Sequence, residues 1–225
     1  MHDIVQMLMM GAAGQSGQAS REAGGSEAGN LASVTTFTTA ALSIGTAAAD
    51  RIVLVAVTVD EQAYGTPVIT AVTVGGTSAA ELVRYSTTRY CTAIWALAVP
   101  TGTTAAIGVT INQAVEAYSL AISAVYGVVP SPAYTVGSAP AGSGDITGVR
   151  NGVVITATGS SSGVYSGSVT VDSNVTSGAS AYCACQKAYA LPTSSGTVSP
   201  SSAALTAIHT SPFRSHPNKE PPCSC

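Results

Sequence analysis

The feature that most constrains the fold is a series of short β-branched segments separated by turn residues. The strongest is residues 52–59, which consist of Ile, Val, Leu, Ala and Thr. Residues 105–111 place Ile and Val at alternate positions, which is the period of a strand with one buried face. No segment after residue 30 shows a convincing helical stripe, and residues 47–50 and 113–116 are single helical turns at most. The chain is therefore predicted to be all-β.

Turn signals divide these segments into about eleven strands. Gly75-Gly76 predicts a tight hairpin turn, with residues 80–85 as the strand that returns from it. Regularly spaced short strands of this kind are typical of an antiparallel β-sandwich or jelly roll. The predicted strands are residues 34–42, 52–59, 68–74, 80–85, 90–99, 105–111, 118–129, 153–158, 164–171, 179–189 and 203–209.

Both ends of the chain are predicted to be extended arms. Residues 11–30 are mostly Gly, Ala, Ser and Gln, too poor in large apolar side chains to form a core. We therefore divide the chain into an N-terminal anchoring arm (1–32), a β-sandwich domain (33–210) and a Pro- and Cys-containing C-terminal arm (211–225). The C-terminal arm holds four prolines, which do not fit a central strand.

The N-terminal arm has an apolar tip, which we interpret as an assembly anchor held by a neighbouring subunit. Its residues are Ile4, Val5, Met7, Leu8, Met9 and Met10.

Charged residues make up only 8% of the chain, against roughly 25% in typical soluble domains. A surface of Ser, Thr, Gly and Ala costs little to desolvate against a neighbour, which suits a permanent assembly.

The net charge is −3 and the sequence has no basic stripe, so we expect no nucleic-acid partner. No polybasic segment and no apolar run of roughly 18 residues is present, so we expect no membrane partner. The first ten residues lack Lys and Arg and are a poor secretory signal, which predicts a protein used without export.

No arrangement of catalytic or metal-binding residues stands out in the sequence. The three histidines, His2, His209 and His216, have no metal-ligand spacing. Residues 159–163 match the letters of a nucleophile elbow around Ser161, but a strand pattern follows where that elbow needs a helix. We interpret this segment as a hairpin turn. We predict no enzyme activity, no cofactor, and neither a catalytic nor a metal site.

The cysteines also support a chain without a metal site. The odd number of cysteines and their Cys-x-Cys spacing argue against a disulfide framework or a zinc site. We expect Cys91, Cys183, Cys185, Cys223 and Cys225 to be small apolar residues rather than ligands.

The remaining candidates are an acidic pair and a set of aromatic side chains. Asp60 and Glu61 follow a strand, where a solvated turn is preferred over a calcium site. Trp95 lies inside an apolar strand and is predicted to be in the core. The alternative is a glycan platform, which would need Trp95 and tyrosines such as Tyr85, Tyr90 and Tyr118 to be exposed in one cleft.

Five segments carry a resemblance to a known family: residues 44–57, 69–79, 98–103, 151–158 and 203–207. They are strand-and-turn patterns, and over roughly residues 33–210 they resemble β-sandwich virion proteins of tailed bacteriophages. The resemblance implies a structural role in the particle, assembled in the host cytoplasm, and no catalytic residues. The Cys- and Pro-rich tail after Ser211 departs from the family pattern.

Within this resemblance the expected function is a capsid decoration, cement or head-fibre subunit bound to other virion proteins. The expected partners are major capsid or tail subunits and further copies of the chain. A cyclic trimer is one form that would close the contacts between copies. Two alternatives stay open: a minor tail or fibre-base protein, and a glycan-binding module for host attachment.

Overall fold

The computed structural model describes residues 19–61, 65–129, 142–143, 146–148, 153–159, 165–167, 170–177, 184–190, 196–198, 200–202 and 209–215. These residues contain strands and no helix, so the predicted all-β class is confirmed. Every strand pair among the described residues is antiparallel. The described residues form 17 strands, where the sequence pattern predicted about eleven.

The main sheet has the order β4-β3-β7-β2-β6-β5, and β1 pairs with β7. Its strands are β1 (Ser20–Ser43), β2 (Ile52–Asp60), β3 (Ile69–Val74), β4 (Thr77–Ser78), β5 (Ala80–Ser86), β6 (Tyr90–Ala98) and β7 (Thr104–Tyr126).

A second sheet has the order β13-β14-β11-β17-β8. It contains β8 (Val128–Val129), β11 (Val153–Gly159), β13 (Thr170–Thr176), β14 (Ala184–Ala190) and β17 (His209–Ser215). Two small sheets complete the described part. They contain β9 (Gly142–Ser143), β10 (Ile146–Gly148), β12 (Tyr165–Gly167), β15 (Gly196–Val198) and β16 (Pro200–Ser202).

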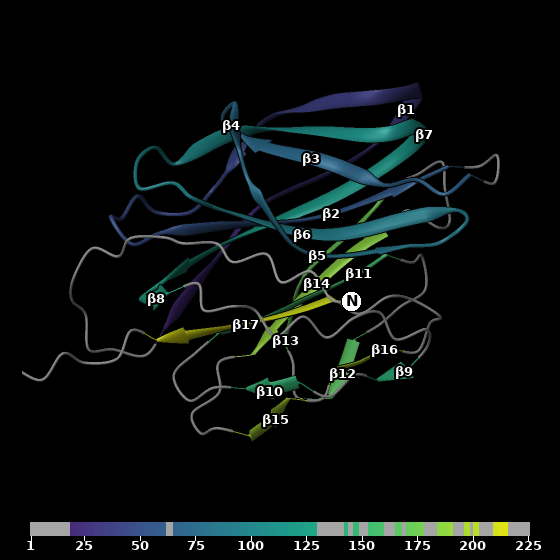
Figure 1. The fold of residues 1–225 in the computed structure, drawn as a ribbon. Helices are drawn as coiled ribbons and strands as arrows, with labels where there is room; N and C mark the ends of the chain where they lie inside the picture. Colours follow the sequence, from purple (N-terminus) through teal and green to yellow (C-terminus); the bar gives the residue numbers. More distant parts are fainter. Residues whose placement is uncertain are drawn as a thin grey trace, which may run out of the picture.

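The long strands β1 and β7 fold the main sheet back on itself. The first part of β7 pairs with β3 and its last part with β2, while β1 pairs along both parts. The register between β1 and β7 shifts on both sides of Val34, and the preceding residue, Ser33, has a φ of 54°. Figure 1 shows the consequence, with β3 and β4 in one layer and β2 and β6 in the next. The sheet nearly closes where Arg84 Nη1 donates to the Ile69 carbonyl at 3.1 Å.

We call these two parts of the sheet the outer and middle layers. The outer layer comprises β4, β3, residues 104–111 of β7 and residues 34–43 of β1. The middle layer comprises residues 20–30 of β1, residues 115–126 of β7, and β2, β6 and β5.

Two cores lie on the two sides of the middle layer. The first, between the outer and middle layers, includes Val55, Val72, Val109 and Leu120. The second, between the middle layer and the second sheet, includes Leu54, Ile94 and Ile155. Because β2 is buried on both faces, its sequence is apolar at successive positions rather than alternating.

Two predicted boundaries were wrong because strand pairing extends across them. β7 runs without interruption through residues 113–116, where the sequence predicted a break. β1 begins at Ser20, inside the segment assigned to the N-terminal arm, and Ser20 pairs opposite Tyr126. In both cases a neighbouring strand supplies backbone hydrogen-bond partners that local composition does not reveal.

The glycines of the N-terminal segment allow close approach between backbones and neighbouring side chains. A Cβ at Gly24 would lie 2.7 Å from Ile122 Cγ2 and 2.8 Å from the Ser43 carbonyl oxygen. A Cβ at Gly29 would lie 2.8 Å from the Tyr118 ring. These glycines are therefore part of the packed structure, whereas the sequence suggested that they form a tether.

The hairpin at Gly75-Gly76 is confirmed, with φ values of 57° and 81° at its two central residues. Its returning strand is β4, while residues 80–86 pair with β6 instead.

The predicted C-terminal boundary at residue 210 falls inside β17, which includes Pro212. Among the described pairs, Pro212 lies opposite Val154 of β11, while β8 pairs only with Arg214 and Ser215. At Pro212, β17 therefore has a described neighbour on one side only. A proline fits such a position because it has no N–H to donate to a second neighbouring strand.

Candidate functional site

The six residues of the predicted assembly anchor, Ile4, Val5, Met7, Leu8, Met9 and Met10, lie outside the described residues. The same is true of Ser161, Cys183, Cys223, Cys225, His2 and His216. The part that can be described contains two polar networks, at the two ends of β2, and one uncharged outer face.

Arg51 forms the first polar network immediately before β2. Its side chain is 1% exposed, and its guanidinium donates to four carbonyl oxygens. Nε donates to Val99 at 2.7 Å, and Nη1 to Gly45 at 2.7 Å. Nη2 donates to Thr101 at 2.7 Å and to Gly102 at 2.8 Å. The guanidinium is rigid and planar and carries several N–H donors, so one side chain can bond to several carbonyl oxygens. These bonds hold the β1–β2 and β6–β7 loops together.

Glu22 of β1 extends this network to the end of β7. Its carboxylate accepts hydrogen bonds from the Thr46 backbone N–H at 2.7 Å and from the Tyr126 hydroxyl at 2.9 Å. The Thr46 bond, followed by the Tyr126 bond, lowers the pKa of Glu22 below its ordinary value. Burial, followed by the bond to Glu22, raises the pKa of Tyr126 to about 12.

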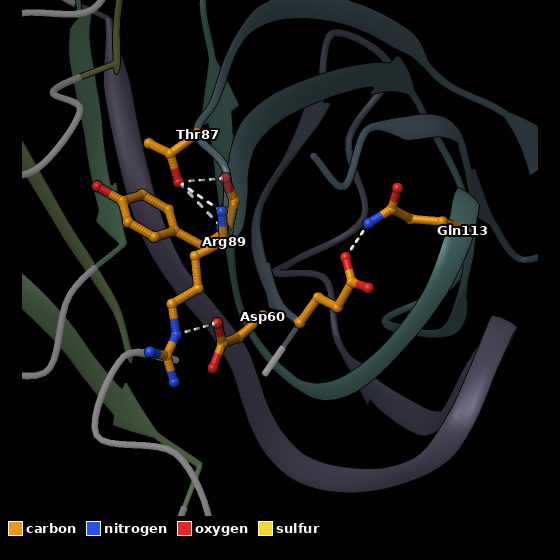
Figure 2. A network of polar contacts seen from close by, with 6 residues as sticks. Asp60, Thr87, Arg89 and Gln113 are labelled. Atoms are coloured by element: carbon orange, nitrogen blue, oxygen red, sulfur yellow. Dashed lines mark hydrogen bonds and ion pairs between the residues drawn. The ribbon is translucent and has the colours of Figure 1, made fainter. Parts of the chain in front are cut away.

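Asp60 forms the second network at the far end of β2 (Figure 2). It is fully buried, and Arg89 Nε lies 3.5 Å from its Oδ1. The interpretation of Asp60 as part of a solvated turn was therefore wrong, because β6 and β7 pair with β2 on both sides as far as this residue.

Thr87 orders the loop that carries Arg89. Its Oγ1 accepts from the backbone N–H groups of Arg89 at 3.2 Å and Tyr90 at 3.0 Å. The Arg89 carbonyl in turn accepts from the Glu61 N–H at 2.8 Å. Figure 2 shows Arg89 extended toward Asp60, with Gln113 on the other side of Asp60, where it donates to Glu61. This network joins the β5–β6 loop to β2 and β7.

These geometries position chain segments rather than reacting groups. In the part that the structure describes, no three His, Cys, Asp or Glu side chains gather as metal ligands would. Cys91 is buried in the first core, and burial raises the pKa of its thiol, which disfavours the reactive thiolate. Cys185 lies in β14.

The aromatic residues considered for glycan binding are largely in the core. Trp95 is 6% exposed, so its predicted core position is confirmed, and Tyr118 is 8% exposed. The Tyr118 ring packs 4.3 Å from the Phe37 ring between centroids, and its hydroxyl donates to Glu27. Tyr85 and Tyr90 are partly exposed at the β5–β6 loop. Trp95 and Tyr118 are therefore too buried to line an exposed cleft.

The outer layer contains no Asp, Glu, Lys, Arg or His in any of its four strand segments. Its inward residues, such as Val72 and Val109, fill the first core. Its outward residues are mainly threonine and serine. We call these the hydroxyl face, consisting of Thr36, Thr38, Thr70, Thr73, Ser78 and Thr110 around Gly108.

Sequence reasoning did not single out this face. The signal was present, because residues 28–49, 65–80 and 90–115 carry no Asp, Glu, Lys, Arg or His, and Thr alternates with apolar residues in two of these stretches. Which threonines share a face became apparent only from the strand register.

No helix among the described residues is long and apolar enough to cross a membrane. Comparisons with protein-family models, curated proteins and solved structures gave no match.

Proposed function

We propose that this chain is a non-catalytic structural subunit of a bacteriophage virion, of the capsid decoration, cement or head-fibre type. In this proposal the main and second sheets belong to an antiparallel β-sandwich or jelly roll. The apolar residues near the N-terminus dock the subunit onto the major capsid or tail proteins.

The observation that carries the proposal is the uncharged outer layer. Interface centres are depleted of charged residues, whereas free surfaces keep them for solubility. Four strand segments without an ionic group therefore favour a surface that is covered in an assembly. The low charge of the whole chain supports the same conclusion.

The two polar networks support a structural role. Arg51 and Glu22 bond to loop backbones, and Asp60 pairs with Arg89 inside the fold. Their geometry serves to hold loops, which fits a rigid particle component.

The proposal is tested with virions of the phage that encodes the chain. Quantitative mass spectrometry should find it in purified particles, with hundreds of copies for a head subunit and a handful for a tail or fibre-base protein. Absence from purified particles would contradict the proposal.

A deletion tests the docking arm separately. Removing residues 1–18 keeps all of β1, whereas a deletion through residue 30 would remove a large part of its pairing with β7. The shortened chain should keep the wild-type thermal unfolding and lose binding to particles. Substituting exposed Thr88 by Ser provides a control that should bind normally. Unchanged binding of the shortened chain would contradict docking through this arm.

A further inference from the structure

We propose that the hydroxyl face is a self-association surface, on which a second copy of this chain docks through the same face. This inference rests on the proposed structural function and identifies the partner and the contact surface.

Strand register aligns the residues of the face in two rows. One row crosses four strands, in the order Ser78, Thr73, Gly108 and Thr38. The next row crosses three strands as Ala71, Thr110 and Thr36. Thr36, Thr38, Ser78 and Thr110 are exposed.

Gly108 keeps the centre of the face low. A Cβ there would lie 2.5 Å from Thr73 Oγ1 and 3.8 Å from Thr38 Oγ1. A side chain at this position would displace the Thr73 hydroxyl and raise the surface between the two rows. Glycine therefore leaves a shallow surface across which another sheet can pack.

The chemistry of the face selects a copy of itself as the partner. A threonine hydroxyl both donates and accepts hydrogen bonds, so a hydroxyl surface is complementary to another of the same kind. Two such surfaces meet without like-charge repulsion. A partner presenting charged groups would have to desolvate them without an opposite charge on this face, which is unfavourable.

Docking through the face is favoured over docking through the nearby edge of β1. The register between β1 and β7 shifts at four places along β1, including the interval between Thr38 and Ala41. Irregularities of this kind disrupt an edge as a template for another strand. Packing through the side chains of the face does not use the backbone of this edge.

The test is the association state of the full chain, measured by analytical ultracentrifugation. The wild type should form dimers or larger oligomers. Because the interface is uncharged, the dissociation constant should stay nearly constant between about 0.05 and 0.5 M NaCl.

Charge substitutions then locate the interface. The double variant Thr36→Glu/Thr110→Glu places carboxylates in one row and should weaken association by about 100-fold or more. The matched variant Thr36→Lys/Thr110→Lys should be weakened similarly. Mixing the two should restore association, because opposite charges then face each other.

Thr88→Glu provides the control, because this exposed residue lies in the β5–β6 loop outside the outer layer, and its association should match the wild type. Thermal unfolding of all variants checks that the fold is retained.

A monomeric wild type at high micromolar concentration, or unchanged association of both double variants, would overturn the inference. If the wild type is monomeric but the chain is found in purified virions, self-association has failed while the proposed function stands. If wild-type oligomers form but never enter virions, the proposed function fails and the self-association stands.

Discussion

Arg51 and Asp60 lie at opposite ends of the same strand, one immediately before β2 and the other at its last residue. Among the residues whose exposure the structure describes, they are the two charged side chains that are buried. Arg51 bonds to loop carbonyls and Asp60 pairs with Arg89. Each end of the most buried strand is therefore fixed to a neighbouring loop by a charged group inside the protein.

Replacing Arg51 by Met should destabilise the protein strongly. The substitution keeps an apolar stem but leaves four carbonyl oxygens without their donor, and each buried unsatisfied group costs about 1–3 kcal/mol. We expect a loss of about 3–5 kcal/mol in the free energy of unfolding in urea, after partial solvation of the loops. The comparison is Arg84→Met, which removes one carbonyl bond, to Ile69, and a partly exposed ion pair with Glu81, and should cost less, about 1–2 kcal/mol. Equal losses in the two variants would show that Arg51 has no special structural role.

The Asp60–Arg89 pair should show energetic coupling. Asp60→Ala leaves the Arg89 guanidinium, whose side chain is 28% exposed, without its carboxylate and should cost about 1–3 kcal/mol. Arg89→Met should also destabilise, because it leaves the Asp60 carboxylate buried without its cation. The double variant should then lose less stability than the sum of the two single variants. Additive losses in a double-mutant cycle would mean that the two groups do not interact.

Glu22 should contribute to the acid sensitivity of folding. Its pKa in the folded protein is lowered below the ordinary 4.5, mainly by the Thr46 N–H. A lowered folded pKa gives a contribution to stability that is complete above pH 4.5 and is lost as the pH falls through the folded pKa. The wild type should therefore exceed Glu22→Gln in unfolding free energy at neutral pH, with the difference shrinking at acidic pH. A difference that is constant across the acid range would contradict this assignment.

Tyr126 should contribute in the opposite direction at alkaline pH. Its pKa is raised from 10.0 to about 12, first by burial and then by the bond to Glu22. Because the folded pKa is higher than the unfolded one, this contribution is complete below pH 10 and is lost as the pH rises toward 12. Ultraviolet titration of tyrosinate should lose one group ionising near 12 in Tyr126→Phe. Retention of all high-pKa groups in that variant would exclude Tyr126 as their source.

Gly24 should tolerate no side chain. Gly24→Ala would place a Cβ 2.7 Å from Ile122 Cγ2, and overpacking of this kind typically costs about 1–3 kcal/mol. Ala23→Val on the same strand is the control, because Ala23 is exposed and should change the unfolding free energy little. Calorimetric melting temperatures compare the two. A Gly24→Ala variant as stable as the wild type would mean that β1 does not pack closely against Ile122.

The sequence predicted the features that depend on local pattern. Residues 52–59 are β-branched and apolar, and they form β2 almost to the residue. The pair Gly75-Gly76 predicted a hairpin turn because only residues that tolerate positive φ fit there. Trp95 was placed in the core because its neighbours in the chain are apolar.

The tertiary structure decided the features that depend on partners distant in sequence. The glycine-rich residues after Ser20 resemble a flexible arm in isolation, yet β7 supplies strand partners for residues 20–23 and 26–30, on either side of a register shift. Asp60 follows an apolar run like any turn acid, but β6 and β7 extend far enough to bury it beside Arg89. The hydroxyl face likewise exists because register aligns Thr36 with Thr110 across strands over seventy residues apart in the chain. Local pattern fixes which residues can form strands, whereas burial and pairing depend on which other strands lie beside them.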